Sequence, residues 1–94
     1  MTPEGKVKAK IAKFLKSIPN CYNFTPVGSM YGRAGVPDII VCHEGRFVGI
    51  EVKAPGKLSG QTALQKYAQM QIEQAGGVYL LVDDVLPITI FFSQ

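Results

Sequence analysis

The sequence has few of the features that mark secreted or membrane proteins. Its only cysteines, Cys21 and Cys42, lack the spacing of a metal site and are too few for a disulfide framework. We therefore expect both to be buried free thiols. No apolar run approaches the roughly 20 residues that cross a bilayer, and the lysine-rich N-terminal region has no apolar signal segment. These absences predict a soluble, cytoplasmic protein without membrane contact.

The composition is that of a globular domain. Hydrophobic residues make up 47% of the 94 residues and charged residues 18%, which argues against a disordered chain. There is no internal repeat, low-complexity segment or linker, so residues 1–94 are expected to form a single domain. Ten Lys and Arg against seven Asp and Glu give a formal net charge of +3. This mild excess permits an anionic partner without requiring one.

A basic amphipathic helix is predicted near the N-terminus. Thr2 suits the capping position and Pro3 the first helical position. Glu4 either complements the helix dipole or, because it continues the inward-facing stripe, acts as a functional carboxylate. The lysines of another face could bind nucleic-acid phosphates or could simply be solvated. The apolar stripe consists of Val7, Ile11, Phe14, Leu15 and Ile18, and the lysine face of Lys6, Lys10 and Lys13.

The rest of the chain is organised around a predicted β-hairpin. A two-residue turn at Glu44-Gly45 sets the register of its strands. In that register Asp38 lies directly opposite Glu51, and Lys53 projects from the same face. These charges then meet at one end of an otherwise apolar strand pair, which is unfavourable unless something binds there. The two strands cover residues 38–43 and 46–53.

The neighbouring carboxylates predict a metal site. Asp38 and Glu51 would repel each other unless one is protonated or a cation lies between them. Mg²⁺ fits, because it takes one or two carboxylates, keeps several waters and leaves positions for phosphate oxygens. Lys53 could help deprotonate an attacking water or stabilise the negative charge that develops on a phosphate. It could also simply balance the charge of Glu51, and these roles are compatible.

Two loops near the hairpin could contact a ligand. An edge strand over residues 21–25 leads into the glycine-rich loop 26–36. In that loop, Tyr31 and Arg33 offer an aromatic surface and a phosphate-binding group, although the loop could equally be a flexible connection. A turn-rich loop with Lys57 follows the hairpin.

A crossover helix over residues 61–75 is predicted next. The apolar run 78–82 then indicates a buried strand parallel to the strand of Glu51. Residues 88–92 suggest a last strand. A glutamine row on the helix is either solvated surface or a source of hydrogen bonds to a phosphate or metal-bound water. The row is Gln61, Gln65 and Gln69, and the apolar stripe beside it is Leu64, Tyr67, Ala68, Ile72 and Ala75.

These motifs resemble the PD-(D/E)xK nuclease superfamily, and the fuller pattern resembles its VRR-NUC branch. The resemblance runs from Glu4 to about residue 82. The family glutamine corresponds best to Gln65, although Gln61 is nearer the Leu-Ser turn. The matching motifs are the acid Glu4, G-x-P-D at 35–38, E-x-K with Ala-Pro-Gly at 51–56, Leu-Ser at 58–59, and Gly-Gly at 76–77.

The resemblance implies a restriction-endonuclease-like α/β core with a mixed sheet, in the order αβββαβ, to which a C-terminal strand could be added. It implies Mg²⁺ as cofactor, with Mn²⁺ able to substitute. The implied metal ligands are Asp38, Glu51 and the Val52 carbonyl, and the other implied catalytic residues are Lys53, Glu4 and Gln65.

We therefore expect Mg²⁺-dependent hydrolysis of DNA phosphodiester bonds in replication or repair, in a bacterial or phage-infected cell. The expected substrate is branched DNA, cut in the manner of a Holliday-junction resolvase by a homodimer that residues 88–92 help to form. One alternative is a sequence-specific restriction-type endonuclease. Another is a catalytically silent module that only binds nucleic acid. The expected nucleic-acid contacts are Lys6, Lys10, Lys13, Tyr31, Arg33 and Lys57.

Overall fold

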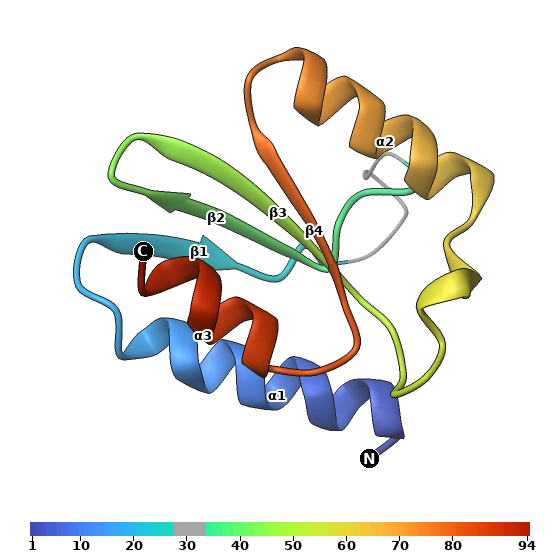
Figure 1. Cartoon of the computed structure of the whole chain (residues 1–94), viewed down its shortest axis with the longest axis horizontal. Coiled ribbons are helices and arrows are strands. Elements are labelled where there is room, and N and C mark those ends of the chain that lie inside the picture. Colours follow the sequence, from blue (N-terminus) through green and yellow to red (C-terminus); the bar gives the residue numbers. More distant parts are fainter. Residues whose placement is uncertain (28–33) are drawn as a thin grey trace.

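The computed structural model describes residues 1–27 and 34–94, so Tyr31 and Arg33 lie outside the described residues. A four-stranded mixed sheet carries helices on both faces (Figure 1). Helices α1 and α3 cover one face, and α2 lies on the other. In chain order the elements are α1 (Pro3–Lys16), β1 (Cys21–Phe24), β2 (Ile39–His43), β3 (Arg46–Val52), the short 3₁₀ turn Leu58–Gly60, α2 (Ala63–Gln74), β4 (Val78–Val82) and α3 (Leu86–Phe92).

The predicted hairpin and its register are confirmed. Glu44 has a φ of 52° and Gly45 a φ of 79°, the left-handed values of the tight turn whose twist matches a β-hairpin. Strands β2 and β3 are antiparallel, with His43 opposite Arg46 and Ile39 opposite Ile50. Asp38, one residue before β2, therefore faces Glu51.

The core lies between the sheet and α1. The helix begins as predicted, with the Thr2 hydroxyl accepting a hydrogen bond from the Gly5 N–H. Burial of a large aliphatic side chain contributes about 1.5–3 kcal/mol, so this face supplies most of the stability. The buried core residues are Val7, Ile11 and Leu15 of α1, Ile39, Val41, Val48, Ile50, Val52 and Val82 of the sheet, and Ile88 of α3.

The predicted order αβββαβ is confirmed, and β4 pairs with β3 in parallel as expected from the crossover. Both β1 and β4 are edge strands. The edge position of β1 was predicted, but β4 is less buried than predicted. Only Tyr79 and Val82 of β4 are buried, because this strand has a neighbour on one side alone.

The C-terminal apolar segment is a helix, so the strand predicted over residues 88–92 is wrong. Pro87 lies in the first turn of α3, where its missing N–H does no harm. Ile88 is fully buried. A short apolar run suits a buried strand and a buried helix equally, so its pattern cannot separate them. Among the described residues, no helix is long and apolar enough to cross a membrane.

Neither cysteine is buried, which contradicts the prediction for both. Cys21 is half-buried and Cys42 is exposed, and both are free thiols. Cys42 follows the core residue Val41 in β2. Side chains alternate along a strand, so Cys42 points away from the core, beside Phe47, whose side chain is also exposed.

The sheet face beneath α2 is only partly filled. Helix α2 has no buried residue, and Leu64 and Tyr67 of its predicted apolar stripe are more than half exposed. A groove of about 680 Å³ runs between this helix and the sheet, lined by residues that include Ile40, Phe47 and Ile72. The charged end of the hairpin lies on this same face.

Gly35 allows the chain before Asp38 to lie directly against α2. Its φ is 82°, and a Cβ atom there would collide with the Leu64 carbonyl and come within 3.0 Å of the Gln65 nitrogen. Two residues later, the buried Pro37 packs over Gly49, where a Cβ atom would lie 2.8 Å from the proline ring. These close approaches hold Asp38 beside the first turn of α2.

Replacing Gly35 by alanine should therefore destabilise the fold strongly. We expect Gly35→Ala to lower the free energy of unfolding by about 3 kcal/mol, from left-handed backbone strain plus collision with α2. Gly56→Ala is the matched control, because Gly56 has a φ of 80° but open space around its Cβ position; it should cost only about 1 kcal/mol. Urea unfolding of both variants measures the difference. Equal losses would show that the collision relaxes without cost.

Candidate active site

Asp38 is held at the end of the hairpin by the backbone of the opposite strand. Its Oδ2 atom accepts a hydrogen bond of 2.8 Å from the Val52 N–H. The Val52 side chain is buried in the core on the other face, so the residue that holds Asp38 is itself fixed. The Lys53 N–H donates to the Val82 carbonyl at 2.8 Å, which ties this end of β3 to β4.

Glu51 is the buried charged residue of the site, with 3% of its surface exposed. Its Oε2 atom accepts a hydrogen bond of 3.0 Å from the Gln65 side-chain amide. Its buried Oε1 atom has no partner in the described part of the chain. Burial, followed by the neighbouring Asp38 carboxylate, raises the pKa of Glu51 to about 7, although Lys53 acts in the opposite direction. The two acids therefore lie close together, and one of their buried oxygens has no hydrogen-bond donor among the described residues.

Lys53 lies against this acid pair. Its Nζ atom is 3.6 Å from Glu51 Oε2 and donates a hydrogen bond of 2.9 Å to Gln65 Oε1. Its side chain is 12% exposed, so the ammonium is largely withdrawn from solvent. The hairpin register accounts for this position, because Lys53 leaves β3 on the same face as Glu51.

Gln65 is brought into the site by the start of α2. Its side-chain Oε1 accepts from the Thr62 N–H at 2.9 Å, and its own N–H donates to the Thr62 hydroxyl at 3.2 Å. This reciprocal pair is a capping box. The T-x-x-Q pattern of residues 62–65 is the sequence signal of this motif.

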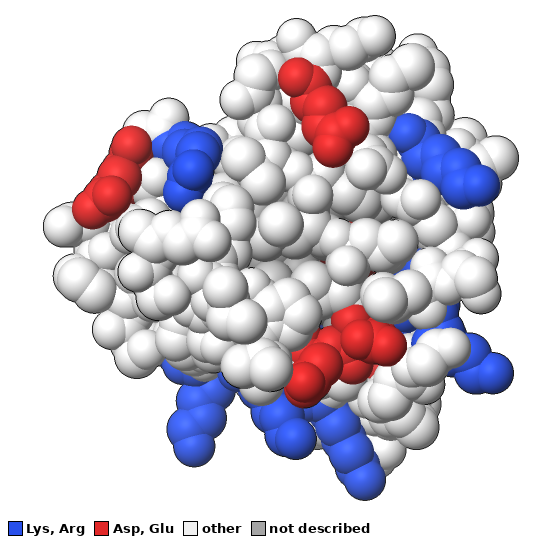
Figure 2. Space-filling model, in the orientation of Figure 1, with Lys and Arg blue, Asp and Glu red and all other residues white. Residues whose placement is uncertain are grey.

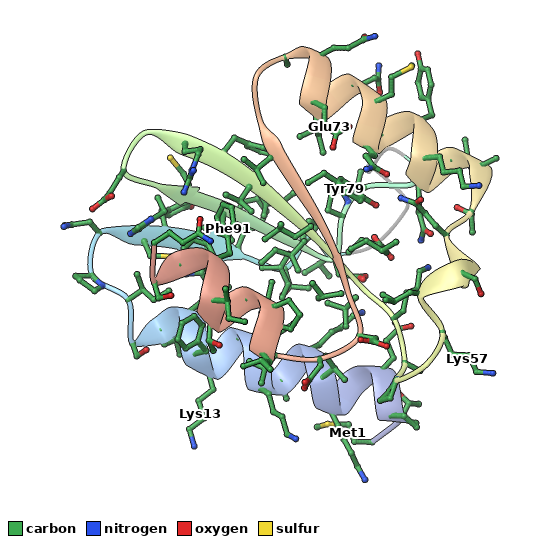
Figure 3. The ribbon with its side chains drawn as sticks, viewed as in Figure 1. Met1, Lys13, Lys57, Glu73, Tyr79 and Phe91 are labelled. Atoms are coloured by element: carbon green, nitrogen blue, oxygen red, sulfur yellow. The ribbon has the colours of Figure 1, made fainter. Side chains whose placement is uncertain are left out.

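Gln61 lies elsewhere. Its amide donates to Gln69 Oε1 at 2.9 Å and to the Tyr79 hydroxyl at 3.2 Å. Gln69 in turn donates to Glu73 at 3.3 Å. The Tyr79 and Glu73 side chains lie between α2 and β4 (Figure 3). Of the two glutamines that matched the family motif, the structure thus places Gln65 against Glu51 and Gln61 in a separate network.

A lysine of α1 also reaches the site, which sequence reasoning missed. Lys8 Nζ lies 3.2 Å from Asp38 Oδ1 and 3.6 Å from Glu4 Oε2. Partial burial alone would lower the pKa of Lys8, but the hydrogen bond and charge of Asp38, helped by Glu4, raise it above its ordinary value. Glu4 is placed near the acid pair through this lysine. The Glu4–Lys8 spacing of four residues was a visible signal, whereas the contact with Asp38 depends on how α1 crosses the sheet.

The predicted nucleic-acid contacts that the structure describes are all at the surface. Lys6, Lys10, Lys13 and Lys57 are exposed, and Lys13 and Lys57 extend into solvent (Figure 3). Figure 2 shows basic side chains projecting along the rim that α1 forms. Lys6 and Lys10 also line a hollow of about 410 Å³ beside Pro55, with Asp83 and Asp84 on its border.

The acid pair fits a hard divalent cation. Asp38 and Glu51 supply carboxylate oxygens, and Glu51 Oε1 is a buried acceptor that a cation would satisfy. No group of three His, Cys, Asp or Glu side chains in the described residues could hold a metal ion. Mg²⁺ suits such a site, because it is usually bound by one or two carboxylates and keeps several waters or phosphate oxygens.

Comparison with known proteins establishes the fold class. No protein-family model matches this sequence, and no curated protein matches it. A solved structure described as a VRR_NUC domain matches with a TM-score of 0.81 and 18% sequence identity, covering 100% of this chain and 98% of the other. The two chains share one fold. The small α/β fold expected from the motifs, with its mixed sheet and restriction-endonuclease-like core, is therefore confirmed.

The raised pKa of Glu51 predicts how stability depends on pH in metal-free protein. The folded state keeps the Glu51 proton up to about pH 7, whereas an ordinary glutamate loses it near 4.5, so the unfolded state binds fewer protons between these values. Wild-type stability should therefore fall as pH rises through this window, by about 2–3 kcal/mol. Glu51→Gln should escape this loss.

The measurement is urea unfolding at pH 4.5 and pH 8 in EDTA. Relative to wild type, Glu51→Gln should be nearly neutral at the lower pH and stabilising at the higher. Glu73→Gln, which removes an exposed carboxylate of α2, is the control and should change little. An equal effect of Glu51→Gln at both pH values would contradict the prediction.

Proposed function

We propose that this chain belongs to the VRR-NUC family of PD-(D/E)xK nucleases and is a metal-dependent DNA endonuclease. The observation that carries this proposal is the grouping of Asp38, Glu51 and Lys53 at one end of the hairpin, where the buried Glu51 Oε1 atom has no partner among the described residues. A stable domain has no structural need for these groups, because burying charge costs free energy. The name of the matching solved structure supports the same family.

Asp38 and Glu51 would hold the cation, with the Val52 carbonyl as a further ligand. Mg²⁺ bound there would acidify an attacking water and offset negative charge on the phosphate, and Mn²⁺ could substitute. The Val52 N–H donates a hydrogen bond of 2.8 Å to Asp38 Oδ2 and so orients this carboxylate. This preorganisation reduces the rearrangement required when the substrate binds.

Lys53, Gln65 and Glu4 would assist the reaction from around the acid pair. Gln65 holds the Lys53 ammonium beside Glu51 through its side-chain oxygen. There the Lys53 ammonium would stabilise the negative charge that develops on the phosphate. Glu4, 3.6 Å from the Lys8 ammonium, would act as an accessory acid.

DNA would approach across the exposed lysines. Lys6, Lys10 and Lys13 on α1, and Lys57 after β3, are available to phosphates; Tyr31 and Arg33 are further candidates. The described residues form one sheet and its helices, with no separate element for reading bases. This favours recognition of DNA shape, so the proposed substrate is branched DNA, cut during replication or repair in the cytoplasm of a bacterial or phage-infected cell.

The decisive experiment measures cleavage of labelled linear, flapped and four-way DNA with Mg²⁺, with Mn²⁺ and in EDTA. Wild type should cut branched DNA only with a cation. Asp38→Asn should reduce the rate by about 10²- to 10³-fold, the usual effect of removing a group that stabilises the transition state. Glu44→Gln is the control, because it removes a carboxylate from the exposed turn at the opposite end of the hairpin.

The alternatives give different results in this experiment. A restriction-type enzyme would cut long linear duplex into discrete fragments, and a silent binding module would bind every substrate without cutting any. If Asp38→Asn cuts as fast as wild type while circular dichroism shows both proteins folded, the proposed site is wrong. Cleavage that persists in EDTA would contradict the metal requirement.

We also infer a homodimer, which would present two sites to the two strands of a branch. Leu86 and Ile90 are 58% and 52% exposed on α3, one helical turn apart, and the helix carries no charged residue to oppose self-association. Light scattering at micromolar concentration should give the dimer mass for wild type and the monomer mass for Ile90→Glu. Met70→Glu on α2, equally polar but on the other face, should remain dimeric. A monomeric wild type would rule out this assembly.

A further inference from the structure

Lys8 differs from the other lysines of α1 in its surroundings. It is half-buried, whereas Lys6, Lys10, Lys13 and Lys16 are exposed. Its ammonium lies between two acids, 3.2 Å from Asp38 Oδ1 and 3.6 Å from Glu4 Oε2. The contact with Asp38 joins the first helix to the start of β2, across about thirty residues of sequence. A solvated lysine face alone does not account for this placement.

With the Lys8 contact, both side-chain oxygens of Asp38 have a partner in the protein. Oδ2 accepts from the Val52 backbone, and Oδ1 faces the Lys8 ammonium. The opposite carboxylate differs, because Glu51 Oε2 is paired while Oε1 has no partner in the described residues. Two lysines, Lys8 and Lys53, thus partly balance the acids before any cation binds. A cation bound between Asp38 and Glu51 would share the Asp38 carboxylate with the Lys8 ammonium, which lies 3.2 Å from Oδ1.

We propose that Lys8 is an internal counter-cation that competes with the divalent cation for the Asp38 carboxylate. This inference rests on the proposed metal site. An ammonium and a divalent cation that share the Asp38 carboxylate repel each other at such short range, so Lys8 weakens cation binding. In the metal-free protein the same ammonium stabilises the fold by offsetting the charge of Asp38. Lys8 is thus a positioning residue that stabilises the fold of the metal-free protein and lowers its affinity for the divalent cation.

The first test measures the binding of Mn²⁺ to the whole chain by calorimetry, without DNA. Lys8→Met keeps the length and the apolar stem of the side chain but removes the charge. It should bind Mn²⁺ at least about tenfold more tightly than wild type, comparable to the effect of one neighbouring charge on a pKa. Lys8→Arg keeps the charge and should bind like wild type. Lys16→Met, which removes an exposed charge from the same helix, is the matched control and should also bind like wild type.

The second test separates this role from a purely structural one. In EDTA, Lys8→Met should melt at a lower temperature than wild type, because Asp38 loses its counter-cation. Saturating Mn²⁺ should raise its melting temperature by more than it raises that of wild type, because a ligand stabilises the folded state according to its affinity. A purely structural lysine would lower both melting temperatures equally.

These results distinguish failure of this inference from failure of the proposed function. If Lys8→Met binds Mn²⁺ no more tightly than wild type, Lys8 is not a competitor, although the metal site itself stands. Asp38→Asn should abolish the binding. If it binds as well as wild type, or if neither wild type nor Lys8→Met binds Mn²⁺, both the inference and the proposed metal site are wrong.

Discussion

A carboxylate buried beside a second carboxylate is the constraint on which the rest of the structure depends. Glu51 is almost completely withdrawn from water, and Asp38 faces it from the neighbouring strand. Such a pair is tolerated only if other parts of the chain supply hydrogen bonds and opposite charge. Lys53, Gln65 and Lys8 do so from three separate elements. The site therefore depends on correct docking of α1 and α2 as much as on the hairpin.

The two faces of the sheet differ in packing and in charge. The face under α1 and α3 is filled with aliphatic side chains and includes fully buried Ile50 and Val52. Glu51, between them in sequence, points to the face under α2, where packing is incomplete. Side chains alternate along a strand. Ile50 and Val52 therefore pack into the core, while Glu51 between them points to the opposite face and reaches the site. A charged group can thus be held accurately without lying in the main core.

Local sequence patterns predicted the parts of the site that depend on residues close together in the sequence. The turn at Glu44-Gly45 determines the hairpin register, and that register determines which charges meet. The segment after Asp84 was wrongly predicted, because a short apolar run fits a helix as well as a strand. The contact between Lys8 and Asp38 could not be predicted, because no local pattern shows where α1 crosses the sheet. The likeness of fold to a solved VRR_NUC domain adds the architecture but not these contacts.

Gln65 takes part both in the capping box of α2 and in the site around Glu51. Its side-chain oxygen closes the first turn of α2 by accepting from Thr62, and the same oxygen accepts from the Lys53 ammonium. Helix ends fray more readily than helix centres, and local opening precedes global unfolding in most domains. Each time the first turn of α2 opens, Lys53 loses its orienting partner and Glu51 loses its amide donor. The fraction of time for which Gln65 contacts both Lys53 and Glu51 therefore depends on the local stability of a single helical turn, and hydrogen exchange at the Gln65 amide would report it.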